Sequence, residues 1–303
     1  MKAINLHLSL RALGYLVALG ETGHFGKAAA RCFVSQPTLS AQVKKMEDQL
    51  GVQLVERGQQ VRLTDIGARI AERAREMIQA ACEIEDLARN FQDPLAGELR
   101  IGLIPTVGPY LLPHIAQPLR EQFPRLRLLL LEHQTHKLIE LLRSGELDVG
   151  ILALPIPVER LVSQTLYHEN FQVALPADHA LAKRRRISLD DLDGETLLLL
   201  EDGHCLRDQA LAACRLARVR EAPDFRATSL ETLRQMVAAG VGITLLPGLA
   251  IEQQDARSPA MAVRRFTDPE PARTIAAAWR PGSAREETIG HLCSAIAAVM
   301  AGR

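Results

Sequence analysis

The 303-residue sequence contains no long uninterrupted apolar run. A helix that spans a bilayer needs about 18 or more consecutive apolar residues, and no stretch approaches that length. The apolar run at residues 13–19 is also too short for the core of a secretory signal peptide, and sequence typical of a folded domain follows it directly. We therefore expect a cytoplasmic protein.

Cysteine is scarce as well. The five cysteines are odd in number and unevenly spaced, and none forms a CxxC or Cys/His cluster with the spacing of a zinc site. We therefore predict no metal and no cofactor. Cytosolic thiols are reduced by default, so a disulfide here would be catalytic or sensory.

The sequence also lacks a net charge, because 36 Lys and Arg balance 36 Asp and Glu. The distribution is uneven, however. Residues 1–65 carry eight Lys and Arg against five Asp and Glu, an excess of three positive charges. This asymmetry favours a nucleic-acid contact near the N-terminus. Length alone suggests about two domains.

Residues 1–63 predict three helices and a hairpin. Apolar periodicity predicts a helix over 8–22, and an alanine-rich segment predicts a short one over 26–32. A third helix is capped by Ser35 and ends at Gly51, and the hairpin that follows turns at Arg57 and Gly58. Together these elements predict an all-α winged helix-turn-helix unit.

The third helix has two different faces. One is an apolar stripe formed by Leu39, Val43, Met46 and Leu50. The other could read DNA, because short polar side chains reach base edges and basic ones reach phosphates. The candidates are Ser35, Gln36, Thr38 and Gln42 for bases, and Lys45 and Arg57 for phosphates. Taken alone, the solvated face of a surface helix explains these residues equally well.

Residues 64–90 predict one long helix without proline, about 40 Å in length. Its apolar positions lie near a 3.5-residue repeat: Ile66, Ile70, Met77, Ala81, Ile84 and Ala88. We expect a linker helix that dimerises, although a helix lying on its own domain is the alternative. Residues 91–98 then predict a hinge.

From residue 99 onward, predicted strands and helices alternate, which favours mostly parallel sheets with helices on both faces. The length of this part predicts a regulatory α/β domain of two lobes around a cleft. We place the first lobe at about 99–165 and 269–303 and the second at about 166–268. Within the second lobe we expect a strand at 171–175 and a helix at 206–217.

The segment LLLLEDGHCLRDQALAACRLA places Cys205 at a predicted helix N-terminus, beside His204 and close to Arg207. The helix dipole and these neighbours favour the thiolate, which is the nucleophilic form of cysteine. Cys214 lies nine positions further on, about 13.5 Å along an unbroken helix. A disulfide needs Cα atoms within about 7 Å, so these two cysteines can bond only if the helix unwinds.

The run AAARCFVSQPTLSAQVKKMEDQLGVQLVER resembles the DNA-binding domain of LysR-type transcriptional regulators, with ordinary substitutions at Ala41 and Lys44. The resemblance implies a sequence-specific regulator that binds double-stranded promoter DNA and works with RNA polymerase. It also implies a periplasmic-binding-protein-like regulatory domain, and a homodimer that assembles into a homotetramer.

Further runs resemble the peroxide-sensing members of that family: GLIPTVGPYLLPHI, EHQTHKLIELLRSGELDVGILAL, LLLLEDGHCLRDQA and FRATSLETLRQMVAAGVGITLLP. This resemblance implies that hydrogen peroxide oxidises Cys205 and that Cys214 resolves the product into a reversible disulfide. It also implies that a reductant of the glutaredoxin or thioredoxin type reverses the change.

The same resemblance implies peroxide-pocket roles for Thr106, Thr135, His204 and Arg273. The family tends to have two adjacent arginines where this chain has Ala272 and Arg273, so the position that supplies the guanidinium stays open. Fixed donors would stabilise the hydroxide that a thiolate expels from peroxide. For the two threonines, helix capping is the alternative interpretation.

The remaining cysteines, Cys32, Cys82 and Cys293, are interpreted as structural. Two other functions stay open: a regulator that binds a metabolite in its cleft, with the cysteines incidental, and a thiol peroxidase or Cys-His hydrolase. The sequence shows no carboxylate placed to orient a catalytic histidine, and a switch that requires refolding suits signalling better than turnover. We therefore expect a regulator, not an enzyme.

Overall fold

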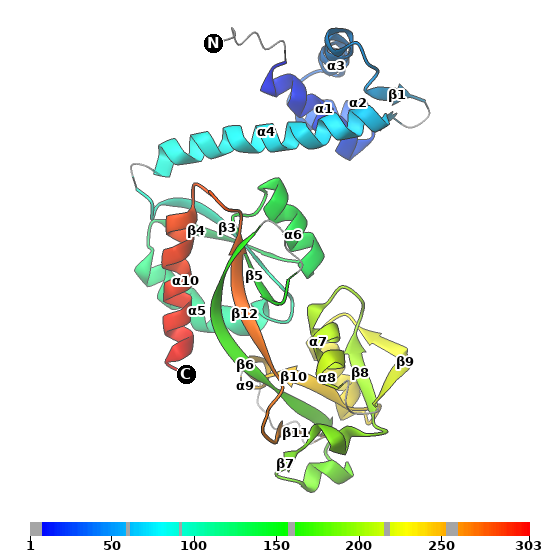
Figure 1. Ribbon diagram of the computed structural model, residues 1–303, viewed down its shortest axis with the longest axis vertical. Helices are drawn as coiled ribbons and strands as arrows, with labels where there is room; N and C mark the ends of the chain where they lie inside the picture. Colours follow the sequence, from blue (N-terminus) through cyan, green and yellow to red (C-terminus); the bar gives the residue numbers. More distant parts are fainter. Residues whose placement is uncertain (1–7, 59–60, 91–92, 157–160, 215–218, 253–259) are drawn as a thin grey trace. The chain divides into compact units, whose positions relative to one another are not determined.

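The computed structural model describes residues 8–58, 61–90, 93–156, 161–214, 219–252 and 260–303 (Figure 1). The chain forms two compact units, Met1–Arg89 and Asn90–Arg303. Across these described stretches, no helix combines the length and the apolar character needed to cross a membrane.

The first unit contains the three predicted helices and the predicted hairpin, all of which are confirmed. They are α1 (Leu10–Thr22), α2 (Phe25–Arg31), α3 (Gln36–Leu50), β1 (Val55–Arg57) and β2 (Val61–Leu63). The α3 helix begins because the Ser35 hydroxyl accepts a hydrogen bond from the Thr38 N–H at 3.3 Å. It ends because Gly51 adopts a left-handed φ of 68°, as the glycine predicted.

The apolar stripe of α3 forms the core of this unit, with one exception. Leu39, Val43 and Met46 are buried, whereas Leu50, the last member of the stripe, is 36% exposed. Leu50 is the last residue of α3, where the chain turns away from the core. One turn earlier in α3, Glu47 connects the helix to the start of the wing. Its carboxylate accepts hydrogen bonds from the N–H groups of Leu54 and Val55 at 2.8 and 3.1 Å.

The predicted long helix is confirmed as α4 (Asp65–Asn90). One side of its first half packs on the other helices of this unit, since Ala71 and Ala74 are buried and Ile78 contacts the same core. Large apolar side chains on another side remain exposed: Ile66 (39%), Met77 (48%) and Ile84 (67%). Thus one side of α4 packs on its own unit, and the exposed apolar side chains of the other side form a stripe that we call the seam of α4.

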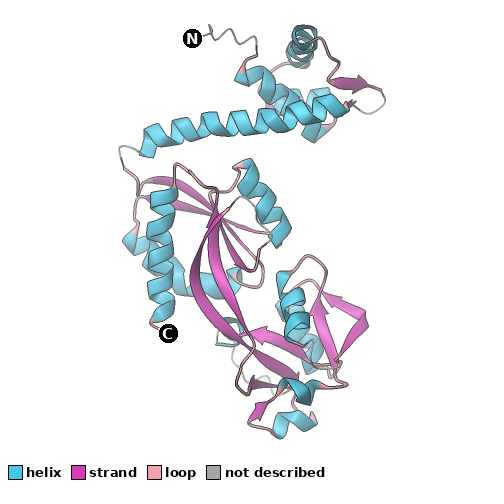
Figure 2. Ribbon diagram, in the orientation of Figure 1, coloured by secondary structure: helices cyan, strands magenta, loops and turns pink. Residues whose placement is uncertain are grey.

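The second unit is an α/β domain (Figure 2). Its helices are α5 (Gly108–Gln122), α6 (Thr135–Ser144), α7 (Cys205–Ala213), α8 (Leu230–Ala238), α9 (Gly248–Glu252) and α10 (Glu286–Ala301). Its strands are β3 (Gly97–Leu103), β4 (Leu126–Glu132), β5 (Val149–Leu154), β6 (Val162–Pro176), β7 (Arg186–Ile187), β8 (Thr196–Leu200), β9 (Arg220–Ala227), β10 (Thr244–Pro247), β11 (Met261–Phe266) and β12 (Ala272–Trp279).

The sheets of this unit are mixed, so the expectation of mostly parallel pairing is wrong. The large sheet has the order β4-β3-β5-β12-β6-β11-β7, and β10 also pairs with β6. Pairs of β3 with β4 and β5 are parallel, but β12 runs antiparallel to both β5 and β6. Two crossing antiparallel strands therefore connect the halves of the unit.

The longest of these strands, β6, was only partly predicted. The expected strand at 171–175 is the end of a strand that begins at Val162. The first part of β6 pairs with β12, and the last part pairs with β10 and β11, so β6 runs from one lobe into the other (Figure 1). Its first part was missed because exposed polar residues interrupt the apolar signal.

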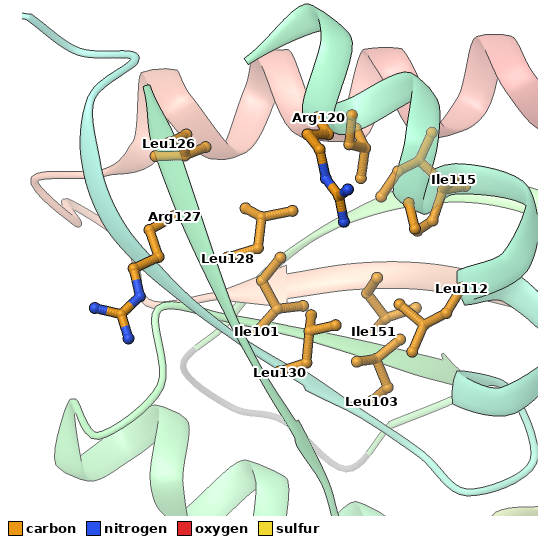
Figure 3. Close-up of a pocket in the computed structure, with 13 residues that line it drawn as sticks. Ile101, Leu103, Leu112, Ile115, Arg120, Leu126, Arg127, Leu128, Leu130 and Ile151 are labelled. Carbon is orange, nitrogen blue, oxygen red and sulfur yellow. The ribbon is translucent and has the colours of Figure 1, made fainter. Parts of the chain in front are cut away.

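An apolar groove of about 290 Å³ lies between α5 and the sheet at its β4 edge. Figure 3 shows Leu112 and Ile115 of α5 facing Leu128 and Leu130 of β4. Leu130 is 45% exposed. The groove thus lies at the outer, β4 edge of the sheet.

Replacing Glu47 with Ala removes the acceptor for two backbone N–H groups at the start of the wing. We expect the first unit to lose about 1–3 kcal/mol of unfolding free energy, because buried donors left without a partner are costly. Calorimetric unfolding of the full chain measures this loss. Asp48→Ala, one exposed position along, is the matched control; equal stability of both variants would contradict the bridging role of Glu47.

Candidate functional site

Cys205 is the first residue of α7, directly after a tight turn. Strand β8 ends at Leu200, and Gly203 adopts a φ of 96° that L-residues with side chains rarely adopt. A Cβ at Gly203 would also lie 2.6 Å from Gln134 Oε1. The turn therefore needs glycine, and it brings the start of α7 against the start of α6. The helix predicted over 206–217 begins one residue earlier and ends at Ala213, while residues 215–218 lie outside the described part.

A buried guanidinium, that of Arg273 on β12, forms the centre of the adjacent cluster. Its Nη1 donates to Thr106 Oγ1 at 3.0 Å and its Nη2 to Thr106 O at 2.9 Å. Its Nε donates to Glu169 Oε1 at 2.8 Å, and the other oxygen of Glu169 accepts from the Leu249 N–H. The guanidinium carbon lies 6.0 Å from the centre of the Phe171 ring. Each of the three guanidinium nitrogens of Arg273 thus has a fixed partner.

The question left open between positions 272 and 273 has a geometric answer. Ala272 is exposed, whereas Arg273 is buried at 4% exposure beside Thr106. Neighbouring residues of a strand point to opposite faces. In this chain the guanidinium at the cluster comes from Arg273.

Burial raises the pKa of the Cys205 thiol above its usual value. Arg273 is the main opposing influence, followed by the Thr135 hydroxyl and the N–H groups of Leu206 and Cys205 at the helix N-terminus. The expectation that its surroundings favour the thiolate overall is therefore wrong, because desolvation outweighs them. The expected helix N-terminus does contribute.

Arg207, the arginine near Cys205 in the sequence, is not the cation that acts on its thiol. Arg207 pairs with Asp202 at 3.0 Å and with Glu221 at 2.8 Å, so its charge is compensated away from the thiol. Arg273, 68 positions from Cys205 along the chain, is the cation that acts on it. Proximity in the sequence favours Arg207, whereas the family resemblance implies Arg273, which strand pairing brings to the cluster.

Neither predicted pocket threonine caps a helix. The N-cap positions of α5 and α6 are Val107 and Gln134, and neither makes a side-chain capping bond. Thr106 accepts from Arg273, as described above. Thr135 Oγ1 is buried without a nitrogen or oxygen partner in the described part of the chain, and it interacts with the Cys205 thiol. Both hydroxyls therefore face the cluster.

His204 is buried at 6% exposure, and burial lowers its pKa, with Glu201 opposing. Glu201 Oε1 lies 3.8 Å from His204 Nε2, too far for a hydrogen bond, and accepts one from Gln134 Nε2 at 3.2 Å. Sequence analysis missed this carboxylate beside the histidine. Burial therefore disfavours the charged form of this imidazole.

Cys214 is the C-cap residue of the same helix, α7. Its N–H donates to Ala210 O at 3.0 Å, so the helical path from Cys205 is unbroken, as predicted. Burial raises the pKa of the Cys214 thiol to about 11. Both thiols are free, and about 13.5 Å of helical rise separates them. A disulfide between them is incompatible with this structure.

The other three thiols differ in setting: Cys293 is buried, Cys32 half-buried and Cys82 exposed. Burial raises the pKa of the Cys293 thiol to about 12. No group of three or more His, Cys, Asp or Glu residues among those described is arranged to hold a metal ion.

On α3, the predicted base-reading residues lie at the helix start and along one outer face. Gln36, Thr38 and Lys45 are exposed and Gln42 is half-buried. Ser35 Oγ lies 2.8 Å from Thr38 Oγ1, so these two hydroxyls already form one unit at the N-terminus. The side chain of Arg57 lies outside the described part of the chain.

Two family models match this chain: "Bacterial regulatory helix-turn-helix protein, lysR family" over residues 10–68, and "LysR substrate binding domain" over residues 92–301. The chain therefore belongs to the LysR family of bacterial transcription regulators.

Individual relatives cover nearly the whole chain. A protein of Dickeya chrysanthemi named hydrogen peroxide-inducible genes activator is 49% identical over 91% of this chain and 90% of its own. A full-length OxyR variant from Pseudomonas aeruginosa is 41% identical, with a TM-score of 0.77 over 96% of this chain and 95% of that one. The oxidised form of OxyR is 49% identical, with a TM-score of 0.64 over 69% of this chain and 99% of that one.

Replacing Thr135 with Val removes one of the groups that stabilise the Cys205 thiolate, so we expect the pKa of that thiol to rise further. Peptide-resolved alkylation across a pH series measures the midpoint, which should move to higher pH. Thr274→Val, which removes a hydroxyl bonded to His168, is the control and should leave the midpoint in place. An unchanged midpoint in the Thr135 variant would show that its hydroxyl does not act on the thiol.

Proposed function

We propose that this chain is a transcription regulator that hydrogen peroxide switches through a reversible Cys205–Cys214 disulfide. The observation that carries the proposal is the placement of these thiols at opposite ends of one unbroken helix, with the first at the polar cluster. The printed name of the Dickeya relative and the oxidised state of a solved relative support the oxidant and the switch.

The first step is oxidation of Cys205. The thiolate sulfur attacks one oxygen of peroxide, an S–O bond forms, the O–O bond breaks, and hydroxide leaves and takes up a proton as water. Thr135, Thr106, His204 and Arg273 are the donors that we assign to the peroxide and to the departing oxygen. Burial raises the pKa of the thiol, and Arg273 is the main influence that opposes this rise and favours the thiolate.

The second step joins the two thiols. Cys214 attacks the sulfenic sulfur of Cys205, an S–S bond forms, and the sulfenic oxygen leaves as water. Since α7 holds the cysteines apart, at least part of this helix must unwind first. A thiol-disulfide reductant of the glutaredoxin or thioredoxin type returns both residues to thiols.

The consequence for DNA follows from the position of α7. This helix connects β8 to β9, so its unwinding changes the surface that this lobe presents to a partner subunit. The uncovered seam of α4, which includes Met77 and Ile84, is the dimer contact that we propose between copies. A changed arrangement of subunits then alters the spacing of the DNA-reading units.

Within this proposal, residues 1–63 bind promoter DNA, 64–90 link and dimerise, 91–98 form a hinge, and 99–303 sense peroxide. Bases are contacted by Ser35, Gln36, Thr38 and Gln42, and phosphates by Lys45 and Arg57. A homotetramer built from dimers, contact with RNA polymerase and a cytoplasmic location complete the proposal. The mixed polar and basic outer face of α3 supports the DNA contact.

Stoichiometric peroxide should oxidise the Cys205 and Cys214 thiols and expose amides across α7 to hydrogen exchange. Mass spectrometry of alkylated peptides identifies the thiols, and hydrogen exchange of the same samples reports the helix. Cys205→Ser should abolish both changes while leaving the reduced fold and DNA binding intact.

Cys82→Ser, which removes the exposed thiol of α4, is the control and should respond as the unmodified chain does. A DNA-binding response to peroxide that survives Cys205→Ser would move the sensor elsewhere. Unchanged protection of α7 in a chain with a verified disulfide would refute the unwinding step.

Gln42→Ala should weaken binding to a specific site relative to random DNA by about 1–3 kcal/mol, because a base contact carries discrimination. Lys45→Ala should weaken both DNAs similarly and lower the salt-dependence slope by about one. Titrations at several salt concentrations measure both effects. Equal losses on specific and random DNA for Gln42→Ala would contradict its base-reading role.

A further inference from the structure

The turn between α2 and α3 carries an aromatic ring that the fold does not use. Phe33 is 95% exposed, far more than any other large apolar side chain in the described part of the first unit outside α4; Leu10 follows at 45%. The ring therefore contributes almost nothing to the core, although burial of a phenylalanine is among the stronger stabilising contributions available to a small unit.

The backbone at this position also disfavours phenylalanine. Phe33 has a φ of 54° and is the one residue other than glycine with a positive φ among those described. The turn that sets this φ is held by hydrogen bonds from the Phe33 N–H to Ala30 O and from the Val34 N–H to Ala29 O. Glycine and asparagine adopt the left-handed region far more readily than a bulky aromatic residue. Neither packing nor backbone geometry accounts for Phe33.

The neighbouring residues of Phe33 indicate which kind of partner its ring contacts. It lies two residues before Ser35, the N-cap of α3, and the exposed neighbours along the chain are polar: Arg31, Ser35 and Gln36. A protein-docking surface would need a contiguous apolar patch, and this ring stands among polar side chains. In helix-turn-helix proteins the N-terminal residues of the recognition helix contact base edges, so this turn lies at the end of α3 that enters the major groove.

We infer that Phe33 is a further specificity-determining residue, whose ring contacts the C5-methyl group of a thymine in the major groove. An apolar side chain reads thymine through that methyl group, which no other base of DNA carries. The inference rests on the proposed DNA-reading role of α3 and adds a base contact from outside that helix. The strained turn is then retained for DNA recognition and not for stability.

The test uses the full reduced chain and a duplex selected by that chain from random sequence. Phe33→Asn should keep or raise the melting temperature, because asparagine suits the left-handed turn, yet weaken binding to the selected duplex by about four-fold, the contribution of one buried methyl group. Phe33→Gly should behave in the same way. Val52→Asn, at another exposed apolar position, is the matched control and should bind normally.

Replacing thymines of the selected duplex one at a time with uracil removes single methyl groups. At one position the unmodified chain should lose about the same four-fold, and Phe33→Asn should lose nothing further, since coupled residues are not additive. Unchanged affinity of Phe33→Asn, or a loss that no uracil reproduces, would overturn the inference. Gln42→Ala distinguishes a failure of this inference from a failure of the proposed function. If neither Phe33→Asn nor Gln42→Ala loses discrimination between the selected duplex and random DNA, the proposed DNA-reading face of α3 is wrong. If Gln42→Ala loses discrimination and Phe33→Asn does not, only the role of Phe33 fails.

Discussion

The buried guanidinium of Arg273 is the constraint on which the second unit depends. A charge without solvent must be compensated, and Glu169 and Thr106 compensate it from β6 and from the turn after β3. Arg273 and these two partners belong to three separate stretches of the sheet and its loops, so one side chain fixes their mutual positions. The same charge is the strongest influence that favours the Cys205 thiolate. Folding and sensing therefore share this interaction.

That charge also distinguishes the half-buried Cys205 from the fully buried thiols. Desolvation alone would keep the Cys205 thiol protonated, as it does for Cys214 and Cys293, for which burial is the one cause of the raised pKa. Cys205 differs because Arg273, Thr135 and the start of α7 all oppose burial. Selectivity among the buried thiols thus comes from oriented donors, whereas exposure distinguishes Cys82.

Local features were predicted from sequence and long-range ones were not. The bounds of α3 follow from periodicity and caps, those of α4 follow from periodicity and the absence of proline, and the separation of Cys205 from Cys214 follows from helical rise. Proximity in the sequence favoured Arg207 as the partner of the thiol. Arg273 was implied by the family resemblance alone, because strand pairing is what brings it to the cluster. The first part of β6 was also missed because it depends on a long-range contact. Pairing with β12 stabilises this part of the strand, whereas exposed polar residues interrupt the apolar pattern of its own sequence.

The α7 helix, which the proposed disulfide requires to unwind, is weakly anchored. Only Leu206 and Ala210 of α7 are buried, whereas α5 of the same unit buries Tyr110, Leu111, Ile115 and Leu119. Gln209 Oε1 is buried without a hydrogen-bond partner, which removes a further stabilising contribution. Few buried apolar contacts mean a low free energy of local opening. Opening of α7 by the proposed disulfide would therefore cost little, whereas the buried contacts of Arg273 hold the sheet together.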